Sequence, residues 1–212
     1  MSEKAWIRSF QNAGALWLYE GEPSPDKPHG EMTSGKHSNG FFNASLVIKD
    51  PHLLNSACSE LSSLIGGKSQ VSWVIGSAMG AVTIAYQMWD FVDSAKYAGF
   101  TEKVVDDMVL KRFSLEPDSQ VLVVEDVMTT GGTTRKTIAA IERAGGQVID
   151  TIGVLVNRSG MVDLDGRKIV ALIERELPLW ESENCPYCKI GSKALRPKEH
   201  WHELVGNTSQ EK

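Results

Sequence analysis

The sequence of 212 residues has few cysteines and no long hydrophobic run. Its three cysteines, Cys58, Cys185 and Cys188, are an odd number, so a disulfide framework of the kind found in small secreted domains is not expected. Charged residues occur within the first four positions, which argues against a signal peptide and against a membrane-spanning N-terminus. We therefore expect a cytoplasmic protein with reduced thiols.

Positive charge is also scarce. The chain has 22 Lys and Arg against 27 Asp and Glu, a formal net charge of −5 and a pI of about 5.6. Without a general basic surface, we expect neither nucleic acid nor a membrane as a partner. The phosphate-binding patterns G-x-x-x-x-G-K-[ST] and G-x-G-x-x-G are absent, and no Ser/His/Asp or Cys/His set can be placed at one edge of a sheet.

What the chain does contain is strand-like apolar runs that alternate with helical patterns. This alternation predicts a mainly parallel, Rossmann-like α/β sheet flanked by helices. We expect one domain with a core of about residues 66–160 and a small hood subdomain from residues 1–65 and 161–212. The predicted strands are Val71–Ile75, Lys96–Phe100, Met108–Phe113, Val121–Val124, Val148–Val156 and Lys168–Ile173. The predicted helices are residues 3–20, 50–65, 81–89 and a segment ending at Gly145.

The most informative stretch begins with the apolar run Val121–Val124. Two carboxylates, Glu125 and Asp126, follow it, and then comes Thr-Thr-Gly-Gly-Thr-Thr over residues 129–134. Ligands of open parallel sheets bind beyond the carboxyl ends of strands. Glycines, hydroxyls and the N–H groups that begin a helix together favour a phosphate, while the acidic pair suits ribose hydroxyls or a metal carried by a pyrophosphate. The alternative is a turn that merely links a strand to a helix.

A second turn of small residues repeats this arrangement. The strand Val71–Ile75 is followed by Gly76-Ser77-Ala78-Met79-Gly80 and then by a helical pattern. We expect a second phosphate-binding turn at the same edge of the sheet.

The acidic pair with its Thr/Gly-rich turn resembles the 5-phosphoribosyl-1-pyrophosphate (PRPP) motif of type I phosphoribosyltransferases, and the resemblance covers most of residues 28–158. It implies that fold and a Mg²⁺-dependent glycosyltransferase, in which the pyrophosphate carries the metal and the protein supplies no metal site of its own. Under this resemblance Asp126 and Lys103 are the catalytic candidates. The implied PRPP-binding residues are Ser77, Ala78, Met79, Gly80, Lys103, Glu125, Asp126, Thr129, Thr130, Gly131, Gly132 and Thr133.

The segment Thr-Ser-Gly-Lys-His-Ser-Asn-Gly-Phe-Phe-Asn, residues 33–43, looks like the N-terminal segment of orotate phosphoribosyltransferases. That branch makes orotidine 5'-monophosphate and pyrophosphate in pyrimidine nucleotide synthesis. The resemblance implies that Phe41 and Phe42 contact the base and that Arg158 reaches the orotate carboxylate. Alternation along a strand would instead place one of the two aromatics in the core, and a lone arginine at a strand end is often a surface residue.

The segment around Lys103 resembles the mobile catalytic loop of the family. In that family the loop lysine neutralises the departing pyrophosphate across a dimer interface, so the resemblance also implies a homodimer. The alternative is a solvated Lys103, with Lys111 or Arg112 in its place. The family's lysine before Ser-Gly is replaced by Thr33, and residues 77–80 lack a lysine. A phosphoribosyltransferase for another base, or a non-catalytic regulator that senses PRPP, therefore stays open.

The tail contains Cys185-Pro186-Tyr187-Cys188, followed by His200 and His202. Two cysteines and two histidines are typical of a structural zinc site. The His-x-His spacing of one residue is shorter than usual, so reduced, structural cysteines are the alternative.

Overall fold

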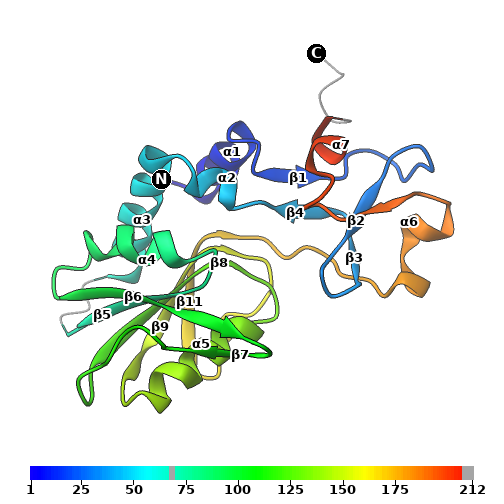
Figure 1. The fold of residues 1–212 in the computed structure, drawn as a ribbon. Coiled ribbons are helices and arrows are strands. Elements are labelled where there is room, and N and C mark those ends of the chain that lie inside the picture. Colours follow the sequence, from blue (N-terminus) through cyan, green and yellow to red (C-terminus); the bar gives the residue numbers. More distant parts are fainter. Residues whose placement is uncertain (67–69, 207–212) are drawn as a thin grey trace. The chain divides into compact units, whose positions relative to one another are not determined.

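The structure is a computed structural model that describes residues 1–66 and 70–206. The chain forms two compact units, drawn in Figure 1. The core unit comprises residues 1–6 and 44–175, and the hood unit comprises residues 7–43 and 176–212. Residues 1–6, 44–65 and 161–175, which we expected in the hood, thus belong to the core unit.

The core unit is built on a seven-stranded sheet with the order β10-β11-β9-β8-β5-β6-β7. Strands β6, β5, β8, β9 and β11 run parallel to their neighbours, while β10 and β7 pair antiparallel at the two edges. The predicted mainly parallel α/β sheet is confirmed. The strands are β5 (Trp73–Ser77), β6 (Tyr97–Val104), β7 (Asp107–Val109), β8 (Gln120–Met128), β9 (Gln147–Asn157), β10 (Asp163–Leu164) and β11 (Arg167–Glu174).

Helices cover the two faces of this sheet. Helix α4 (Val82–Trp89) connects β5 to β6, and α5 (Gly132–Arg143) connects β8 to β9. Because β6 and β9 lie on opposite sides of the β5–β8 pair, right-handed connections place the two helices on opposite faces. Helix α3 (Pro51–Ile65) packs beside α4, as Figure 1 shows, and the short helix α2 (Ser45–Ile48) precedes it.

Local signals set the ends of α3. The Asp50 carboxylate accepts hydrogen bonds from the N–H groups of His52 and Leu53, and Pro51 occupies the first helical position. The helix stops at Gly66, whose φ of 76° few other residues tolerate. The predicted helix over residues 50–65 is therefore confirmed, while Gly67, the second glycine of the predicted stop signal, lies outside the described residues.

The predicted helix over residues 3–20 is wrong in its second half. Helix α1 spans Glu3–Asn12, and Gly14 then takes a φ of 65°. The next residues form β1 (Leu16–Leu18), which pairs antiparallel with β4 (Gly40–Phe42). The spacing of apolar residues could not distinguish this strand, because its partner lies more than twenty residues away in the sequence.

The hood unit joins both ends of the chain. Its three-stranded sheet has the order β12-β2-β3, in which β12 (Ala194–Leu195) from the tail pairs with β2 (His29–Glu31), and β2 pairs with β3 (His37–Ser38). The tail also forms the 3-10 helix η1 (Ser182–Asn184) and helices α6 (Pro186–Lys189) and α7 (Trp201–Gly206). Residues 207–212, which we expected to fray, lie outside the described residues.

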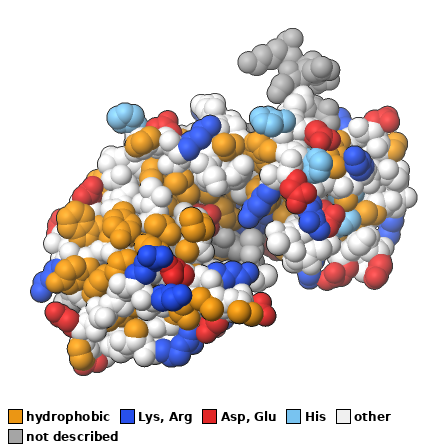
Figure 2. All heavy atoms as spheres, in the orientation of Figure 1, with side chains coloured by type: hydrophobic (Ala, Val, Ile, Leu, Met, Phe, Trp, Pro, Cys, Tyr) orange, Lys and Arg blue, Asp and Glu red, His pale blue; other side chains and the backbone are white. Residues whose placement is uncertain are grey.

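Several large hydrophobic side chains of α4 and β6 are exposed on the core unit. Figure 2 shows them gathered over the region in which Figure 1 draws α4 and β6. Tyr86 and Trp89 of α4 and Tyr97 and Val104 of β6 are each more than 40% exposed. None of the described helices is long and apolar enough to cross a membrane.

The end of β5 lies very close to the start of α4 at Gly76. A Cβ at this position would lie 2.1 Å from the Ala81 carbonyl oxygen. Gly99 on β6, which pairs with Ile75 of β5, is the comparison, because a Cβ there would lie 3.2 Å from the Phe113 ring. We expect Gly76→Ala to lower the free energy of unfolding by about 2–3 kcal/mol and Gly99→Ala by clearly less, because a side chain can shift and a backbone carbonyl cannot. Urea unfolding of both variants measures this, and equal losses would contradict it.

Candidate active site

The centre of the sheet is the place where its chain connections diverge. Strands β5 and β8 are neighbours, and the chain leaves β5 towards β6 but leaves β8 towards β9. At such a switch point the loops beyond the carboxyl ends of the strands separate, and ligands of open α/β sheets bind there. The two turns singled out in the sequence, residues 77–80 and 129–134, both follow these strands.

Glu125 connects the elements around the switch point. The Ser77 hydroxyl, at the end of β5, donates to Glu125 Oε2 at 2.7 Å, and the Thr134 hydroxyl, in the first turn of α5, donates to the same oxygen at 3.2 Å. The side chain is buried. Burial, followed by the negative charge of Asp126, raises the pKa of Glu125 to about 8. In the ligand-free chain this carboxyl group is therefore mostly protonated at neutral pH.

A row of hydroxyl groups extends the network from Glu125. Thr137 donates to Ser77 Oγ at 3.2 Å, and the hydroxyls of Thr137 and Thr101 are 2.9 Å apart. Thr101 and Thr137 were not predicted as site residues from the sequence, and Thr134 was named only as the last residue of the Thr/Gly-rich stretch. For Thr134 and Thr137 a signal exists, since a spacing of three places both on one side of the helix that follows the motif. Thr101 has no comparable local signal.

Asp126 differs from its neighbour in being only partly buried. Its Oδ1 accepts a hydrogen bond from the Val127 N–H at 2.7 Å. Its Oδ2 faces the other turn, where a Cβ added to Gly80 would lie 2.1 Å away. Only glycine fits at position 80 while Asp126 keeps this position, so the turn after β5 and the second carboxylate lie in close contact.

The turn over residues 129–133 leads into α5 through a left-handed residue. Gly131 has a φ of 72°, and a Cβ there would lie 2.5 Å from the Leu164 side chain. Arg135 holds the turn by donating to the Thr130 carbonyl oxygen at 2.9 Å. The side chains of Thr129, Thr130 and Thr133 are exposed. Exposed hydroxyls beside the N–H groups of a helix start suit an anion the size of a phosphate.

The turn after β5 has the same exposure at its tip. Ser77 is buried, Ala78 and Gly80 are partly buried, and the Met79 side chain is 85% exposed. The peptide bond between Ala78 and Met79 is cis. The structure thus brings Ser77 and Gly80 to the acidic pair, whereas the Met79 side chain points to solvent.

Arg158 follows the next strand of the sheet. Its N–H donates to the Met128 carbonyl oxygen at 3.0 Å, which joins the end of β9 to the end of β8. The side chain is buried rather than on the surface, and burial lowers the pKa of the guanidinium to about 10. It stays charged at neutral pH, and a buried cation beside a ligand site favours a carboxylate or a phosphate.

Lys103 lies in a hairpin instead of the expected loop. Strand β6 continues to Val104 and pairs with β7, with Lys103 opposite Met108. Because side chains alternate along a strand, Lys103 points to the same side of β6 as Thr101, which belongs to the hydroxyl row. Lys103 is exposed and forms no ion pair within the described part of the chain, whereas Arg112 is paired with Glu102.

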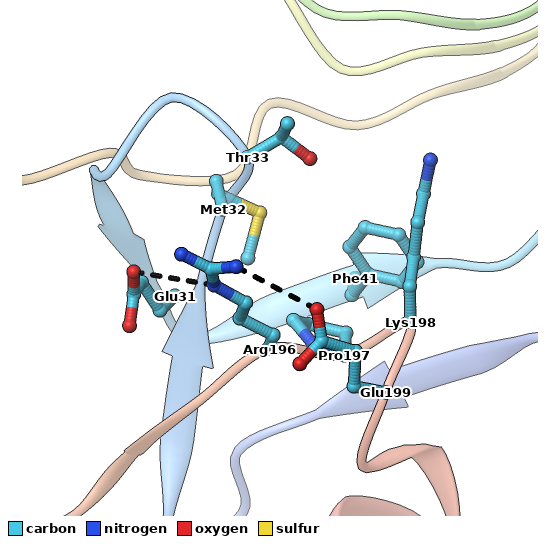
Figure 3. Close-up of a pocket in the computed structure, with 8 residues that line it drawn as sticks. All are labelled: Glu31, Met32, Thr33, Phe41, Arg196, Pro197, Lys198 and Glu199. Carbon is cyan, nitrogen blue, oxygen red and sulfur yellow. Dashed lines mark ion pairs between the residues drawn. The ribbon is translucent and has the colours of Figure 1, made fainter.

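The hood unit has a pocket of its own, of about 310 Å³, shown in Figure 3. Phe41 lines it together with two cations, Arg196 and Lys198, of which Arg196 lies between two carboxylates. Phe42 faces the other way and is buried, with its ring centroid 5.9 Å from that of Phe10. The alternation that we considered for the two aromatics is therefore present, and Phe42 is the core residue.

Residues 54–181 match the phosphoribosyl transferase domain family. The chain belongs to this phosphoribosyltransferase family. The match spans both turns, the acidic pair and Arg158, so the residues gathered at the switch point lie within the family's domain.

Relatives that match almost the whole chain are named as phosphoribosyltransferases that act on orotate. The chain is 41% identical to the orotate phosphoribosyltransferase of Pelotomaculum thermopropionicum over 93% of this chain and 97% of that protein. It is 34% identical to the orotate phosphoribosyltransferase of Caldicellulosiruptor bescii, with the same coverage of 93% and 97%.

Solved structures of phosphoribosyltransferases share the fold. The orotate phosphoribosyltransferase of Aeropyrum pernix aligns with a TM-score of 0.60 at 23% identity, over 80% of this chain and 93% of that one. The corresponding enzyme of Mycobacterium tuberculosis H37Rv aligns with a TM-score of 0.59 at 17% identity, over 80% and 95%.

The surroundings of Glu125 predict a pH dependence of stability. Its pKa rises from 4.5 in the unfolded chain to about 8 in the folded chain, so between these values the folded state holds a proton that the unfolded state has lost. This contribution to stability is complete below pH 4.5 and is lost as the pH rises towards 8. Glu125→Gln keeps the size and an acceptor oxygen but does not ionise. We expect the thermal midpoint of this variant to depend less on pH between 4.5 and 8 than that of the unsubstituted protein.

The exposed Glu22→Gln is the control for the loss of one charge, and it should leave the slope unchanged. A Glu125→Gln profile parallel to that of the unsubstituted protein would contradict the protonated state of Glu125.

Proposed function

We propose that this protein transfers a 5-phosphoribosyl group from PRPP to orotate, in the presence of Mg²⁺, and releases orotidine 5'-monophosphate and pyrophosphate. The observation that carries the proposal is the meeting of the acidic pair and the two small-residue turns at the switch point of the sheet, through Glu125, Ser77 and Gly80. The curated relatives named orotate phosphoribosyltransferase support orotate as the base.

PRPP would lie across the switch point. The turn over residues 129–133 and the first N–H groups of α5 would bind the 5-phosphate. Asp126, the more accessible carboxylate, would hold the ribose hydroxyls. Glu125 would keep the two turns in place through its hydrogen bonds with Ser77 and Thr134. Residues 77–80 would face the pyrophosphate. Catalysis then consists of positioning and of stabilising charge as the bond from ribose C1 to the pyrophosphate oxygen breaks and a bond to the base nitrogen forms.

Magnesium fits this arrangement as a group carried by the substrate. The partly buried Asp126 carboxylate supplies the hard oxygen chemistry that Mg²⁺ prefers, and the glycine at position 80 lets the turn after β5 lie against it. When bound, the ion would neutralise negative charge on the pyrophosphate. The protein's own part is to keep Asp126 oriented, through the hydrogen bond from the Val127 N–H.

Orotate differs from adenine and guanine in carrying a carboxylate. Arg158, buried and charged, is one group that would recognise it. In the hood unit, Phe41 offers an aromatic face and Lys198 a cation in the same pocket. Lys198 forms no ion pair with any described residue, so its charge is available to a ligand. Lys198 would thus replace the positive charge of the family's lysine, whose position is occupied by Thr33 in this chain.

Lys103 would neutralise the leaving pyrophosphate. The exposed hydrophobic side chains of α4 and β6 support a homodimer, because apolar area of this kind is commonly covered by a partner. Lys103 lies on the same strand as two of these exposed residues, Tyr97 and Val104. A dimer formed there would bring the β6–β7 hairpin to the partner's edge, where the lysine could act in either active site.

The direct test is the loss of orotate absorbance when the purified protein is mixed with orotate, PRPP and Mg²⁺. We expect turnover that requires Mg²⁺ and falls by about 100-fold or more in Lys103→Ala, since a group that stabilises charge in the transition state contributes at least this much. Lys111→Ala, the neighbouring alternative, should retain most of the activity.

Failure to consume orotate, with PRPP binding still detectable by calorimetry, would reject orotate and favour another base or a PRPP-sensing role. Loss of activity in Lys111→Ala but not in Lys103→Ala would reject the assignment of the lysine alone.

The pocket of the hood unit makes a separate prediction. We expect Lys198→Ala to raise the KM for orotate by about tenfold and to leave the KM for PRPP nearly unchanged, because the lost cation would contact only the base. Lys193→Ala, an exposed lysine outside the pocket, is the control. Equal changes in both KM values would show that Lys198 does not select the base.

A further inference from the structure

A group of metal-ligating side chains lies in the hood unit, apart from the site described above. His29, His37, Cys185 and Cys188 each offer one ligand atom, and these four atoms all lie within 4.8 Å of one another. The two histidines and Cys185 are buried, and Cys188 is partly buried. Two pairs of residues more than 140 positions apart in the sequence thus meet in one small cluster.

The distances within the cluster are close to those of a tetrahedral site. Cys188 Sγ lies 3.5 Å from His29 Nε2 and 3.2 Å from His37 Nδ1, and the two ring nitrogens are 2.9 Å apart. With usual Zn–S and Zn–N bond lengths, a tetrahedron has edges of about 3.6 Å between sulfur and nitrogen and about 3.4 Å between two nitrogens. For these three atoms, changes of about half an ångström or less give the tetrahedral distances, while Cys185 Sγ lies within 4.8 Å of each of them.

The hydrogen bonds around His29 fix which ring nitrogen can bind a metal. The Ser192 hydroxyl donates its one proton to the Lys27 carbonyl oxygen at 2.6 Å. Its oxygen, 2.9 Å from His29 Nδ1, must then accept the proton of that nitrogen. His29 Nε2 is left with a lone pair directed into the cluster. Such an outer hydrogen bond is a usual companion of metal-binding histidines.

Backbone contacts hold all four ligands in place. His37 exchanges two hydrogen bonds with Trp180, of 2.8 and 2.9 Å, and the His29 N–H donates to the Lys193 carbonyl oxygen at 3.0 Å. Cys185 and Cys188 lie at the two ends of the first turn of α6, which starts with a proline. The ligand positions therefore belong to strands and a helical turn, as a preformed site requires.

We propose that His29, His37, Cys185 and Cys188 bind one zinc ion as a structural site. Two thiolates and two imidazoles in tetrahedral geometry are the ligand set typical of Zn²⁺, and each thiol would release its proton on binding. All four positions are filled by protein atoms, so no position is open for catalysis. The ion links the tail to β2 and β3 and thereby closes the hood unit.

This ligand set differs from the one considered from the sequence. The two cysteines are the same, but His200 Nδ1 is hydrogen-bonded to Glu203 Oε1 at 2.6 Å and the His202 side chain is exposed, and neither belongs to the cluster. The partners of the cysteines are His29 and His37, which are 159 and 151 residues away from Cys188.

The first experiment measures zinc by mass spectrometry in the full chain, purified without a histidine tag and without chelator. We expect about one zinc ion per chain, and loss of it in the double variants Cys185→Ser/Cys188→Ser and His29→Ala/His37→Ala. Two controls should keep the metal: His200→Ala/His202→Ala, which removes the other histidine pair, and Cys58→Ala, which removes the remaining cysteine.

A second experiment does not depend on whether the variants fold. Zinc is removed from the unsubstituted protein with a chelator, and Co²⁺ is added as the probe. We expect the intense visible bands of tetrahedral cobalt and a thiolate-to-cobalt charge-transfer band, together with a lower thermal midpoint of the metal-free protein that added Zn²⁺ restores.

The proposal is overturned if the purified protein contains no zinc and takes up neither Zn²⁺ nor Co²⁺. In that case the cluster is a hydrogen-bonded histidine pair beside reduced thiols. It is equally overturned if the His200→Ala/His202→Ala variant loses the metal while His29→Ala/His37→Ala keeps it. Neither result depends on whether the protein turns over orotate.

Discussion

The buried carboxyl group of Glu125 is the constraint on which the candidate active site depends. A buried polar group is stable only when it is hydrogen-bonded, and Glu125 obtains its donors from Ser77 and Thr134. These donors come from the end of β5 and the start of α5. Satisfying one side chain therefore fixes the distance between two turns that the divergent connections of the sheet would otherwise separate.

The two adjacent carboxylates consequently have different roles. Glu125 is buried, which favours its uncharged form, and its hydrogen bonds connect the turns, while Asp126 is only partly buried and directs Oδ2 towards the turn at Gly80. Alternation along a strand produces this division, because neighbouring side chains of β8 must point to opposite sides. An acidic pair thus combines an internal support with a group that can contact substrate.

The hood unit consists of short elements that need contacts between distant segments for their stability. Its strands have two or three residues each, too few to be stable alone, and its apolar cluster is small. Segments from both ends of the chain meet there through the pairing of β12 with β2. A metal ion bound by His29, His37, Cys185 and Cys188 would add a cross-link where hydrophobic burial is limited.

Features that depend on neighbouring residues could be predicted from the amino-acid sequence. Apolar runs and helix signals gave the parallel sheet, α3 with its Asp50 cap, and both small-residue turns. Local pattern identified the acidic pair but placed it beyond the end of the strand, whereas β8 continues to Met128 and contains both carboxylates. Local pattern failed for the second half of the predicted helix over residues 3–20, where β1 forms because β4 supplies its hydrogen bonds.

Other features became visible only in the folded chain: the burial of Glu125, the contribution of Thr101, the core position of Phe42 and the histidines that accompany Cys185 and Cys188. The physical reason is the same for each. Backbone preferences and periodicity act over a few residues, whereas burial, hydrogen-bond partners and metal ligands depend on segments that only folding brings together.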